Sequence, residues 1–267
     1  MGLKQKVGLI AGRGELPLEV VREIGRRNAE AVVVGLAGEA DPGLKEFGTD
    51  YREIPASQLG KIIETFKTKA VNELVFAGKV GKEALFTDGF DAVFQQLLMR
   101  LPQKNDDAIL LALVEAFEAQ GIKVARQTDY LAQLLAPAGS LLGEVTREEM
   151  ADLQLGFKMA KASGELDIGQ SVVVKGGVVL AVEAIEGTDQ AIIRGGSLGG
   201  PGTVVVKVSK PKQDERFDVP TVGLTTLESM IKARAAVLGI EAGKTFIVDK
   251  QHFLEVALQN NLKIISL

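Results

Sequence analysis

Three carboxylates close together in the second half of the chain are the densest candidate for chemistry. Residues 181–189 read AVEAIEGTD, which places Glu183, Glu186 and Asp189 at the end of a strand-like run. Carboxylate oxygens are ligands that Mg²⁺ prefers, usually one or two of them together with phosphate and water. We therefore expect an Mg²⁺ site here. The alternative is that Thr188 caps a helix whose first turn favours acidic residues.

The turn at Gly187 and Thr188 marks the expected start of that helix. The N–H groups in the first turn of a helix have no partner within the helix, and they can bind a phosphate. We therefore expect Gly187 and Thr188 to contact a phosphate of the substrate.

A second acidic element lies at residues 216–223, which read RFDVPTVG. Because Pro220 biases the residue before it towards an extended conformation, Asp218 is expected at the edge of a short extended piece. A helix should follow from Thr225. Basic residues that could neutralise a pyrophosphate precede this element: Lys207, Lys210, Lys212 and Arg216. The alternative interpretation is a polar loop with an incidental aspartate.

Glycines follow two expected strands in the first half of the chain, where residues 11–17 read AGRGELP and residues 77–82 read AGKVGK. In an open parallel sheet, ligands bind beyond the carboxyl ends of the strands. Four residues are therefore candidate contacts of a nucleotide or phosphate: Gly12, Gly14, Gly78 and Lys79. A simple tight turn and a solvated loop are the alternatives.

Asp106 and Asp107 stand directly before a strongly apolar segment. Acidic residues at a helix N-terminus cap the helix and interact favourably with its dipole. Two adjacent carboxylates exceed what a cap requires, so contact with a ligand is the second interpretation of Asp106 and Asp107.

The composition excludes several kinds of active site. The chain has 267 residues, no cysteine and one histidine, His252, which sits in a helix-like run. Disulfides, thiolate zinc and a cysteine nucleophile are therefore excluded, and a bound metal would need oxygen ligands. The formal charge of −4 argues against nucleic-acid binding. Pro17 stands where the dinucleotide fingerprint needs glycine, which argues against a nicotinamide oxidoreductase.

The elements that must position these residues alternate over the first half of the chain. Short apolar runs predict strands at residues 7–11, 31–36, 73–77 and 122–125. Amphipathic segments predict helices at residues 16–27, 57–69, 90–101 and 107–120. This alternation predicts a parallel sheet covered by helices on both faces.

The pattern changes near residue 135, where small residues and turn formers indicate a linker. Thr146 and Glu149 form a capping-box pattern that opens a helix, and Gly176-Gly177 between β-branched runs indicates a hairpin. Further strands are expected at residues 203–208, 245–248 and 262–266, with a helix from Lys250. We predict an α/β fold with three parts: an N-terminal Rossmann-like domain at 1–135, a linker at 136–145 and a distinct C-terminal catalytic α/β domain at 146–267.

Taken together and in order, these segments resemble the metal-dependent UDP-2,3-diacylglucosamine pyrophosphatase family of lipid A assembly, the type unrelated to calcineurin. The resemblance runs from residue 7 almost to residue 267. The matching segments are residues 8–17 (GLIAGRGELP), 76–80 (FAGKV), 106–107 (DD), 166–170 (LDIGQ), 181–189 (AVEAIEGTD), 210–211 (KP) and 217–223 (FDVPTVG).

The resemblance implies Mg²⁺-assisted hydrolysis of a lipid-linked UDP-sugar to UMP and 2,3-diacylglucosamine 1-phosphate (lipid X), with water attacking the sugar-side phosphorus. It also implies that Asp218 is essential, either as a metal ligand or in activating water. We accordingly expect Asp218, Asp189 and Glu183 to be catalytic and Asp218, Asp189 and Glu186 to bind the metal. The expected substrate contacts then include Gln170 and Thr221.

A substrate with two acyl chains also needs an apolar chamber. The helix from Thr146 offers Met150, Leu153, Phe157 and Met159, but these residues are better explained as plain core. The chain lacks a signal peptide and an apolar run of roughly 18 residues, so we expect a cytoplasmic protein. Contact with the inner membrane and homo-oligomerisation are left open. The alternative function is a non-catalytic nucleotide-sugar binding protein.

Overall fold

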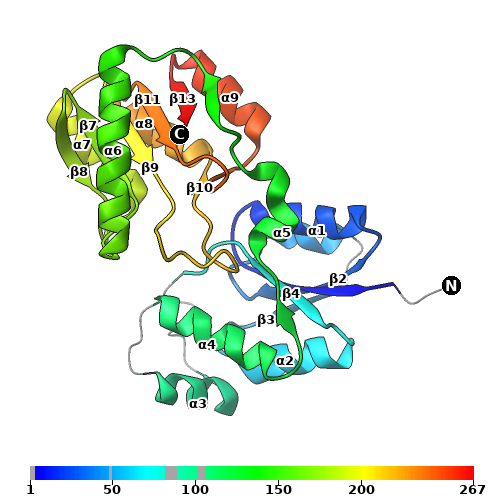
Figure 1. Ribbon diagram of the computed structural model, residues 1–267. Coiled ribbons are helices and arrows are strands. Elements are labelled where there is room, and N and C mark those ends of the chain that lie inside the picture. The colour runs from blue at the N-terminus through cyan, green and yellow to red at the C-terminus, as the bar shows by residue number, and fades with distance from the viewer. Residues whose placement is uncertain (1–3, 48–49, 82–88, 102–105) are drawn as a thin grey trace. The chain divides into compact units, whose positions relative to one another are not determined.

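The computed structural model describes residues 4–47, 50–81, 89–101 and 106–267, with the backbone alone at residues 106 and 107 (Figure 1). The chain forms two compact units. The N-terminal unit comprises residues 1–131 and 215–217, and the C-terminal unit comprises residues 132–214 and 218–267. Each unit is built on its own sheet, so the predicted two-domain α/β class is confirmed.

The sheet of the N-terminal unit has the strand order β3-β2-β1-β4-β5, and all neighbouring strands are parallel. This is the order of a Rossmann-like sheet, in which ligands bind where the order reverses next to the first strand. Its strands are β1 (Lys6–Ala11), β2 (Glu30–Leu36), β3 (Asp50–Ile54), β4 (Glu73–Ala77) and β5 (Lys123–Val124).

Helices cover both faces of this sheet (Figure 1). The elements are α1 (Leu16–Arg26), the 3₁₀ helix η1 (Pro42–Phe47), α2 (Leu59–Thr68), α3 (Ala92–Arg100), α4 (Asp106–Glu118) and α5 (Gln127–Leu131). On α1, Val20, Val21 and Ile24 are buried at helical spacing, which explains why this segment is a helix packed on a sheet.

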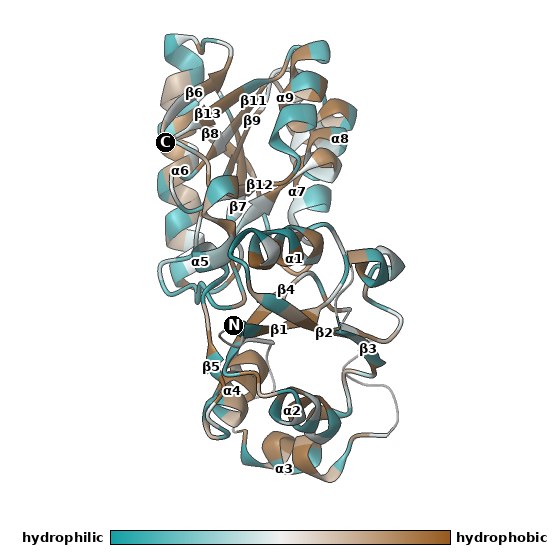
Figure 2. Ribbon diagram, turned by 90° about the vertical axis from the view of Figure 1, so that its right-hand side faces the viewer, coloured by the Kyte–Doolittle hydropathy of each residue, from teal (hydrophilic) through white to brown (hydrophobic). Residues whose placement is uncertain are grey.

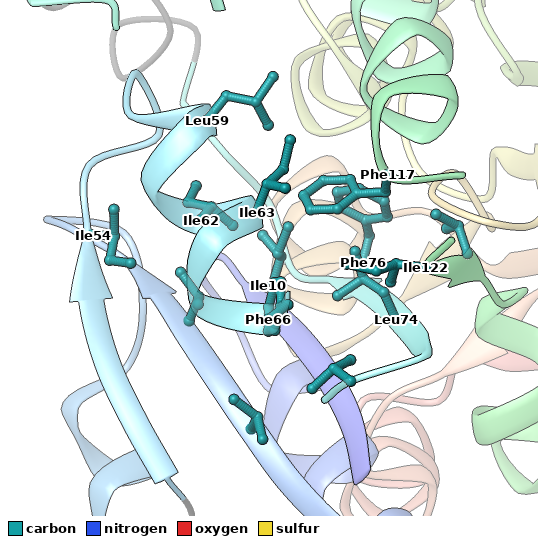
Figure 3. Close-up of a cluster of buried hydrophobic side chains, with 14 of the residues drawn as sticks. Ile10, Ile54, Leu59, Ile62, Ile63, Phe66, Leu74, Phe76, Phe117 and Ile122 are labelled. Atoms are coloured by element: carbon teal, nitrogen blue, oxygen red, sulfur yellow. The ribbon is translucent and has the colours of Figure 1, made fainter. Parts of the chain in front are cut away.

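The opposite face of the sheet carries a core to which α2 and α4 contribute (Figure 3). The ring of Phe117 meets those of Phe66 and Phe76 edge to face, with centroids 6.2 and 6.0 Å apart. Edge-to-face contacts of this kind stabilise aromatic pairs beyond the burial of their area. They fix α4 against β4 and α2.

A short segment from late in the chain belongs to the N-terminal unit. The backbone N–H of Gln127 donates to the carbonyl of Glu215 at 2.8 Å, and Thr128 Oγ1 lies 3.1 Å from Glu215 Oε2. The Gln127 side chain donates to the carbonyls of Phe76 and Phe217 at 2.9 and 3.4 Å. Residues 215–217 are therefore held by α5, and Gln127 of that helix is in turn bonded to β4.

The C-terminal unit has a mixed sheet of order β6-β13-β11-β9-β7-β8 and a separate parallel pair, β10 with β12. Strands β9, β11 and β13 are parallel, whereas β6, β7 and β8 pair antiparallel with their neighbours. The strands are β6 (Gly139–Leu142), β7 (Ser171–Lys175), β8 (Val178–Val182), β9 (Val204–Lys207), β10 (Thr221–Val222), β11 (Val237–Ile240), β12 (Phe246–Ile247) and β13 (Lys263–Ser266).

Figure 2 shows α6 on one face of this sheet and α7, α8 and α9 on the other. Thr146 and Glu149 form the predicted capping box at the start of α6. Leu153 of α6 is fully buried in the core, and Met150, Phe157 and Met159 pack against that core, so the core interpretation of these residues is confirmed. The helices are α6 (Arg147–Glu165), α7 (Thr188–Gly199), α8 (Leu224–Ala233) and α9 (Lys250–Gln259), with the 3₁₀ helix η3 (Ala132–Leu134) before β6.

Residues 136–145, expected to be a linker, contain strand β6, which pairs with β13 at the edge of the C-terminal sheet. Gly139 takes a positive φ of 108°, and Ser140 Oγ donates to the carbonyl of Gly143. The small residues of this stretch therefore shape an edge strand.

In the described part of the chain, no helix combines the length and apolar character that a membrane span requires.

Candidate functional site

The loops after β1 and β4 are joined backbone to backbone. Gly12 N donates to the carbonyl of Ala77 at 2.9 Å, and Arg13 and Lys79 exchange two N–H···O bonds of 2.8 and 2.9 Å. A Cβ atom on Gly12 would lie 2.4 Å from the carbonyl oxygen of Lys79. Gly78 has a φ of +92°, and its Cβ would lie 2.7 Å from the carbonyl carbon of Gly12. Both loops therefore need glycine in order to approach each other.

This pairing changes the expected phosphate cradle. The N–H groups of Gly12, Arg13 and Lys79 bond within the protein, so they do not form the cradle. The side chains of Arg13 and Lys79 are exposed next to the start of α1, and Arg13 Nε lies 2.6 Å from Glu39 Oε2. Gly14 has open space around its α-carbon. Phosphate contact at Gly12, Gly14, Gly78 and Lys79 stays a prediction, carried by cationic side chains and open space.

Helix α4 begins at Asp106, which agrees with the expectation of acidic residues in its first turn. The side chains of Asp106 and Asp107 lie outside the described residues. Their contact with a ligand therefore stays a prediction.

In the C-terminal unit, Gln170, Glu183 and Thr188 come together at one edge of the sheet. Glu183 directly follows β8 and is 9% exposed. Its carboxylate accepts a hydrogen bond from Thr188 Oγ1 at 2.9 Å and one from Gln170 N at 3.4 Å. Gly187, with a φ of +81°, directly precedes α7 as expected. The predicted group of residues around Glu183 thus forms a connected polar cluster.

The segment after β9 begins at the same edge, because Val208 N donates to the carbonyl of Gln170 at 3.0 Å. Glu241, which follows β11, anchors this segment by accepting from Ser209 N at 2.8 Å. Glu241 also accepts two bonds of 3.0 Å from Lys161 Nζ. The segment therefore leaves the sheet from a fixed point.

Gln213 orders the rest of this segment. Its Oε1 accepts from Lys210 N at 2.8 Å and from Ser209 Oγ at 3.0 Å. Its Nε2 donates to Asp218 Oδ2 at 2.6 Å, and Asp218 N donates to the carbonyl of Asp214 at 2.9 Å. Sequence analysis did not single out Gln213. Its position five residues before Asp218 carries no periodic signal that could have identified it.

The basic residues before Asp218 have structural partners. Lys207 Nζ donates to the carbonyl of Thr221 at 3.0 Å, and Lys210 Nζ lies 2.7 Å from Asp167 Oδ1. Arg216 Nη1 is 3.6 Å from Glu118 Oε1 in the N-terminal unit, and Lys212 is exposed.

The hydroxyl of Thr221 donates to the carbonyl of Val219 at 3.0 Å. The remaining candidate, His252, is exposed on α9, as expected of a helical histidine without a catalytic role.

Glu186 and Asp189 are directed to other partners. Glu186 Oε1 accepts from Arg194 Nη2 of α7 at 2.5 Å, and this hydrogen bond lowers the pKa of Glu186. Asp189, in the first turn of α7, accepts from Ser229 Oγ of α8 at 3.2 Å. Neither bond involves a partner of Asp218.

Comparison with known proteins matches both halves of the chain. The model of the LpxI N-terminal domain matches residues 6–134, and that of the LpxI C-terminal domain matches residues 137–265. The chain belongs to the LpxI family. A LpxI relative, the UDP-2,3-diacylglucosamine pyrophosphatase LpxI of Caulobacter vibrioides, is 33% identical over 268 residues, which cover 95% of this chain and 94% of the relative.

Two solved structures resemble this LpxI chain weakly. Pyruvate carboxylase T882A of Rhizobium etli is 14% identical, with a TM-score of 0.29 over 64% of this chain and 15% of the carboxylase. The biotin carboxylase domain of Hydrogenobacter thermophilus 2-oxoglutarate carboxylase is 12% identical, with a TM-score of 0.29 over 67% of this chain and 36% of that domain. Neither likeness supports an argument about this LpxI chain.

The expectation of an Mg²⁺-dependent enzyme is corrected. Among the described residues, no group of three His, Cys, Asp or Glu side chains could hold a metal ion. The three expected ligands, Asp218, Asp189 and Glu186, accept hydrogen bonds from three separate residues: Gln213, Ser229 and Arg194. The name of the Caulobacter LpxI enzyme specifies pyrophosphate hydrolysis. These three carboxylates therefore do not fit the expected Mg²⁺ site.

Proposed function

We propose that this chain hydrolyses the pyrophosphate bond of UDP-2,3-diacylglucosamine. Addition of water across that bond gives UMP and 2,3-diacylglucosamine 1-phosphate. The observation that carries the proposal is the match to the Caulobacter pyrophosphatase over 95% of this chain. A match of that extent involves both units, and the two LpxI family domains span residues 6–134 and 137–265.

We assign the orientation and deprotonation of the attacking water to Asp218. A carboxylate offers about four acceptor sites on its two oxygens, and Gln213 binds Oδ2 of Asp218. Oδ1 can then accept from a water. The water oxygen would bond to the sugar-side phosphorus, the bond from that phosphorus to the bridging oxygen would break, and UMP would leave with that oxygen. Asp218 would take the proton of the water. General base catalysis of this kind contributes typically about 10²–10⁴-fold to the rate.

The cluster around Glu183 is the proposed binding surface for the polar part of the substrate. Gln170, Glu183 and Thr188 are already connected by hydrogen bonds, so the cluster is ordered before substrate binds. The segment that carries Asp218 begins next to Gln170. An ordered site loses less conformational entropy on binding, which favours affinity.

The proposal is tested by measuring UMP release from UDP-2,3-diacylglucosamine. Asp218→Asn keeps the shape of the side chain, and it should lower kcat by at least about 100-fold because the amide cannot accept the proton of water. Glu165→Gln, at an exposed carboxylate at the end of α6, should stay within about twofold of the unmodified protein. A folded, unmodified protein that binds the substrate and releases no UMP would instead be a nucleotide-sugar binding protein.

We extend the proposal to the place where the enzyme encounters its lipid substrate. A lipid with two acyl chains partitions into bilayers, so a cytoplasmic enzyme would load it at the surface of the inner membrane. Exposed Val93 and Met99 on α3 are suited to a shallow apolar contact. The protein should float with liposomes that contain the substrate; if it stays at the bottom of the gradient, this extension is wrong.

A further inference from the structure

A cavity of about 220 Å³ lies inside the N-terminal unit, on the face of the sheet that α2, α3 and α4 cover. Protein interiors are packed about as densely as organic crystals and contain few voids larger than a water molecule. An apolar cavity of about 150 Å³ is already large enough to bind benzene. A space of this size is therefore large enough to hold part of a ligand.

The wall of the cavity is mostly hydrocarbon. Gln127 is the polar side chain in the lining, and its amide is already bonded to the carbonyls of Phe76 and Phe217. A buried water needs two to four polar partners, which such a wall does not offer. Further lining residues come from the sheet and from all three helices: Ile10, Leu36, Ile62, Phe94, Leu113 and Phe117. The chemistry of this wall selects an apolar ligand.

One end of the cavity lies at the paired loops after β1 and β4. Gly12 and Gly78 line the cavity, and the exposed cationic residues Arg13 and Lys79 are their direct neighbours in the chain. Val80 also lines the cavity and is 38% exposed, so this end reaches the surface of the unit. A ligand with an anionic group next to a hydrocarbon chain would match both the cations and the apolar interior.

We propose that this cavity receives one acyl chain of the lipid substrate. The inference rests on the proposed function, which supplies a ligand that has acyl chains and an anionic pyrophosphate. The cavity, rather than the buried face of α6, then provides the apolar chamber that such a substrate requires. Side chains in its wall, Ala56 and Leu113 among them, set how long a chain can enter.

A binding experiment tests the cavity without any turnover. The chain contains no tryptophan, so Val80→Trp introduces a single tryptophan at the cavity wall, which can be excited apart from the two tyrosines. Dodecanoate brominated at its methyl end should quench this tryptophan saturably in the full-length protein. Leu111→Trp is the matched control, because Leu111 lies on α4 outside the lining and is 41% exposed. Equal quenching at both positions, or none at position 80, would overturn the proposal.

A bulkier side chain in the cavity should block entry of the acyl chain. Ala56→Phe, added to Val80→Trp, should raise the concentration for half-maximal quenching at least about tenfold, because hydrophobic pockets discriminate by tenfold or more against a misfit of even one methylene. If Ala56→Phe does not fold, Leu113→Phe fills the same space from α4. An unchanged quenching curve in a folded variant contradicts the cavity as the binding site.

Hydrolysis separates this inference from the proposed function. As a single substitution in the full-length protein, Ala56→Phe should lower kcat/KM at least about tenfold for a substrate with two long acyl chains. It should leave a diacetyl analogue within about twofold. If kcat/KM falls equally with both substrates, or with neither, the cavity is not the binding site of an acyl chain. Absence of UMP release by the unmodified protein contradicts the proposed function, and the quenching experiment still decides about the cavity.

Discussion

Gln213 Nε2 lies 2.6 Å from Asp218 Oδ2, while Oε1 of the same side chain accepts from the backbone of Lys210 and the hydroxyl of Ser209. One amide thus connects the proposed water-activating carboxylate to the start of its own loop. A side chain that bonds at both ends fixes orientation, because neither end can turn without breaking a hydrogen bond.

Gln213→Glu should therefore lower kcat by about 10–100-fold while KM changes by no more than about threefold. Glutamate keeps an acceptor for Lys210 and Ser209, but it removes the donor and places a second carboxylate against Asp218. Steady-state kinetics measure the change. Gln154→Glu, exposed on α6, is the control and should behave like the unmodified protein. A rise in KM with normal kcat would show that Gln213 binds substrate and does not position Asp218.

Gly12→Ala should destabilise the N-terminal unit by about 1–3 kcal/mol, because the added methyl group would overlap the carbonyl oxygen of Lys79. Gly25→Ala, exposed in α1 with open space around it, should instead stabilise the unit by about 0.5–1 kcal/mol. Both tyrosines of the chain, Tyr51 and Tyr130, lie in the N-terminal unit. Urea unfolding followed by tyrosine fluorescence therefore reports on this unit, and equal midpoints for the two variants would refute the close approach of the loops.

Tyr130 makes the stability of the N-terminal unit sensitive to alkaline pH. Burial, together with its hydrogen bond to Glu73, raises the pKa of Tyr130 well above its ordinary value, and the Arg27 guanidinium over its ring opposes this rise. Above about pH 10 the unfolded chain loses the phenol proton while the folded unit keeps it. The free energy of unfolding should then fall as pH rises, by up to about 1.4 kcal/mol per pH unit, whereas below about pH 10 the contribution is complete.

Tyr130→Phe has no phenol proton to lose, so its stability should fall less steeply between pH 10 and pH 11. Urea midpoints by circular dichroism at pH 9, 10 and 11 measure the slopes of both proteins. Parallel slopes would show that Tyr130 does not titrate differently in the folded and unfolded states.

Much of the fold follows from periodicity in the sequence. The strand predicted at residues 73–77 coincides with β4, and the helix predicted at 16–27 ends one residue beyond α1. Strand β3 was missed because of its five residues only Ile54 is buried, so it lacks an apolar run. Strand β11 was missed because only three residues separate Val237–Ile240 from the last residue of α8, so no long turn segment lies between the two elements. Elements with an apolar pattern of their own were predictable. Elements that depend on pairing or packing with neighbouring elements were not.

The sequence located the acidic residues but not their partners. Glu186 and Asp189 are three positions apart, yet one turns to Arg194 along α7 and the other to Ser229 on α8. The bond between Gln213 and Asp218 depends on an irregular loop, for which sequence offers no period. Glu183 is bonded to Gln170 and Thr188. Glu183 follows β8 and Gln170 precedes β7, and these two strands pair antiparallel, which brings the two residues together.

Residues 215–217 also affect how the molecule can be made. The ribosome releases β1 to α5 early, but Glu215 and Phe217, which bond to Gln127, emerge only after most of the second unit has been synthesised. Domains usually fold in the order of synthesis, the N-terminal one first. Here the wall of the first unit's cavity stays incomplete until Phe217 arrives, so the nascent protein carries an open apolar pocket while residues 132–217 are synthesised.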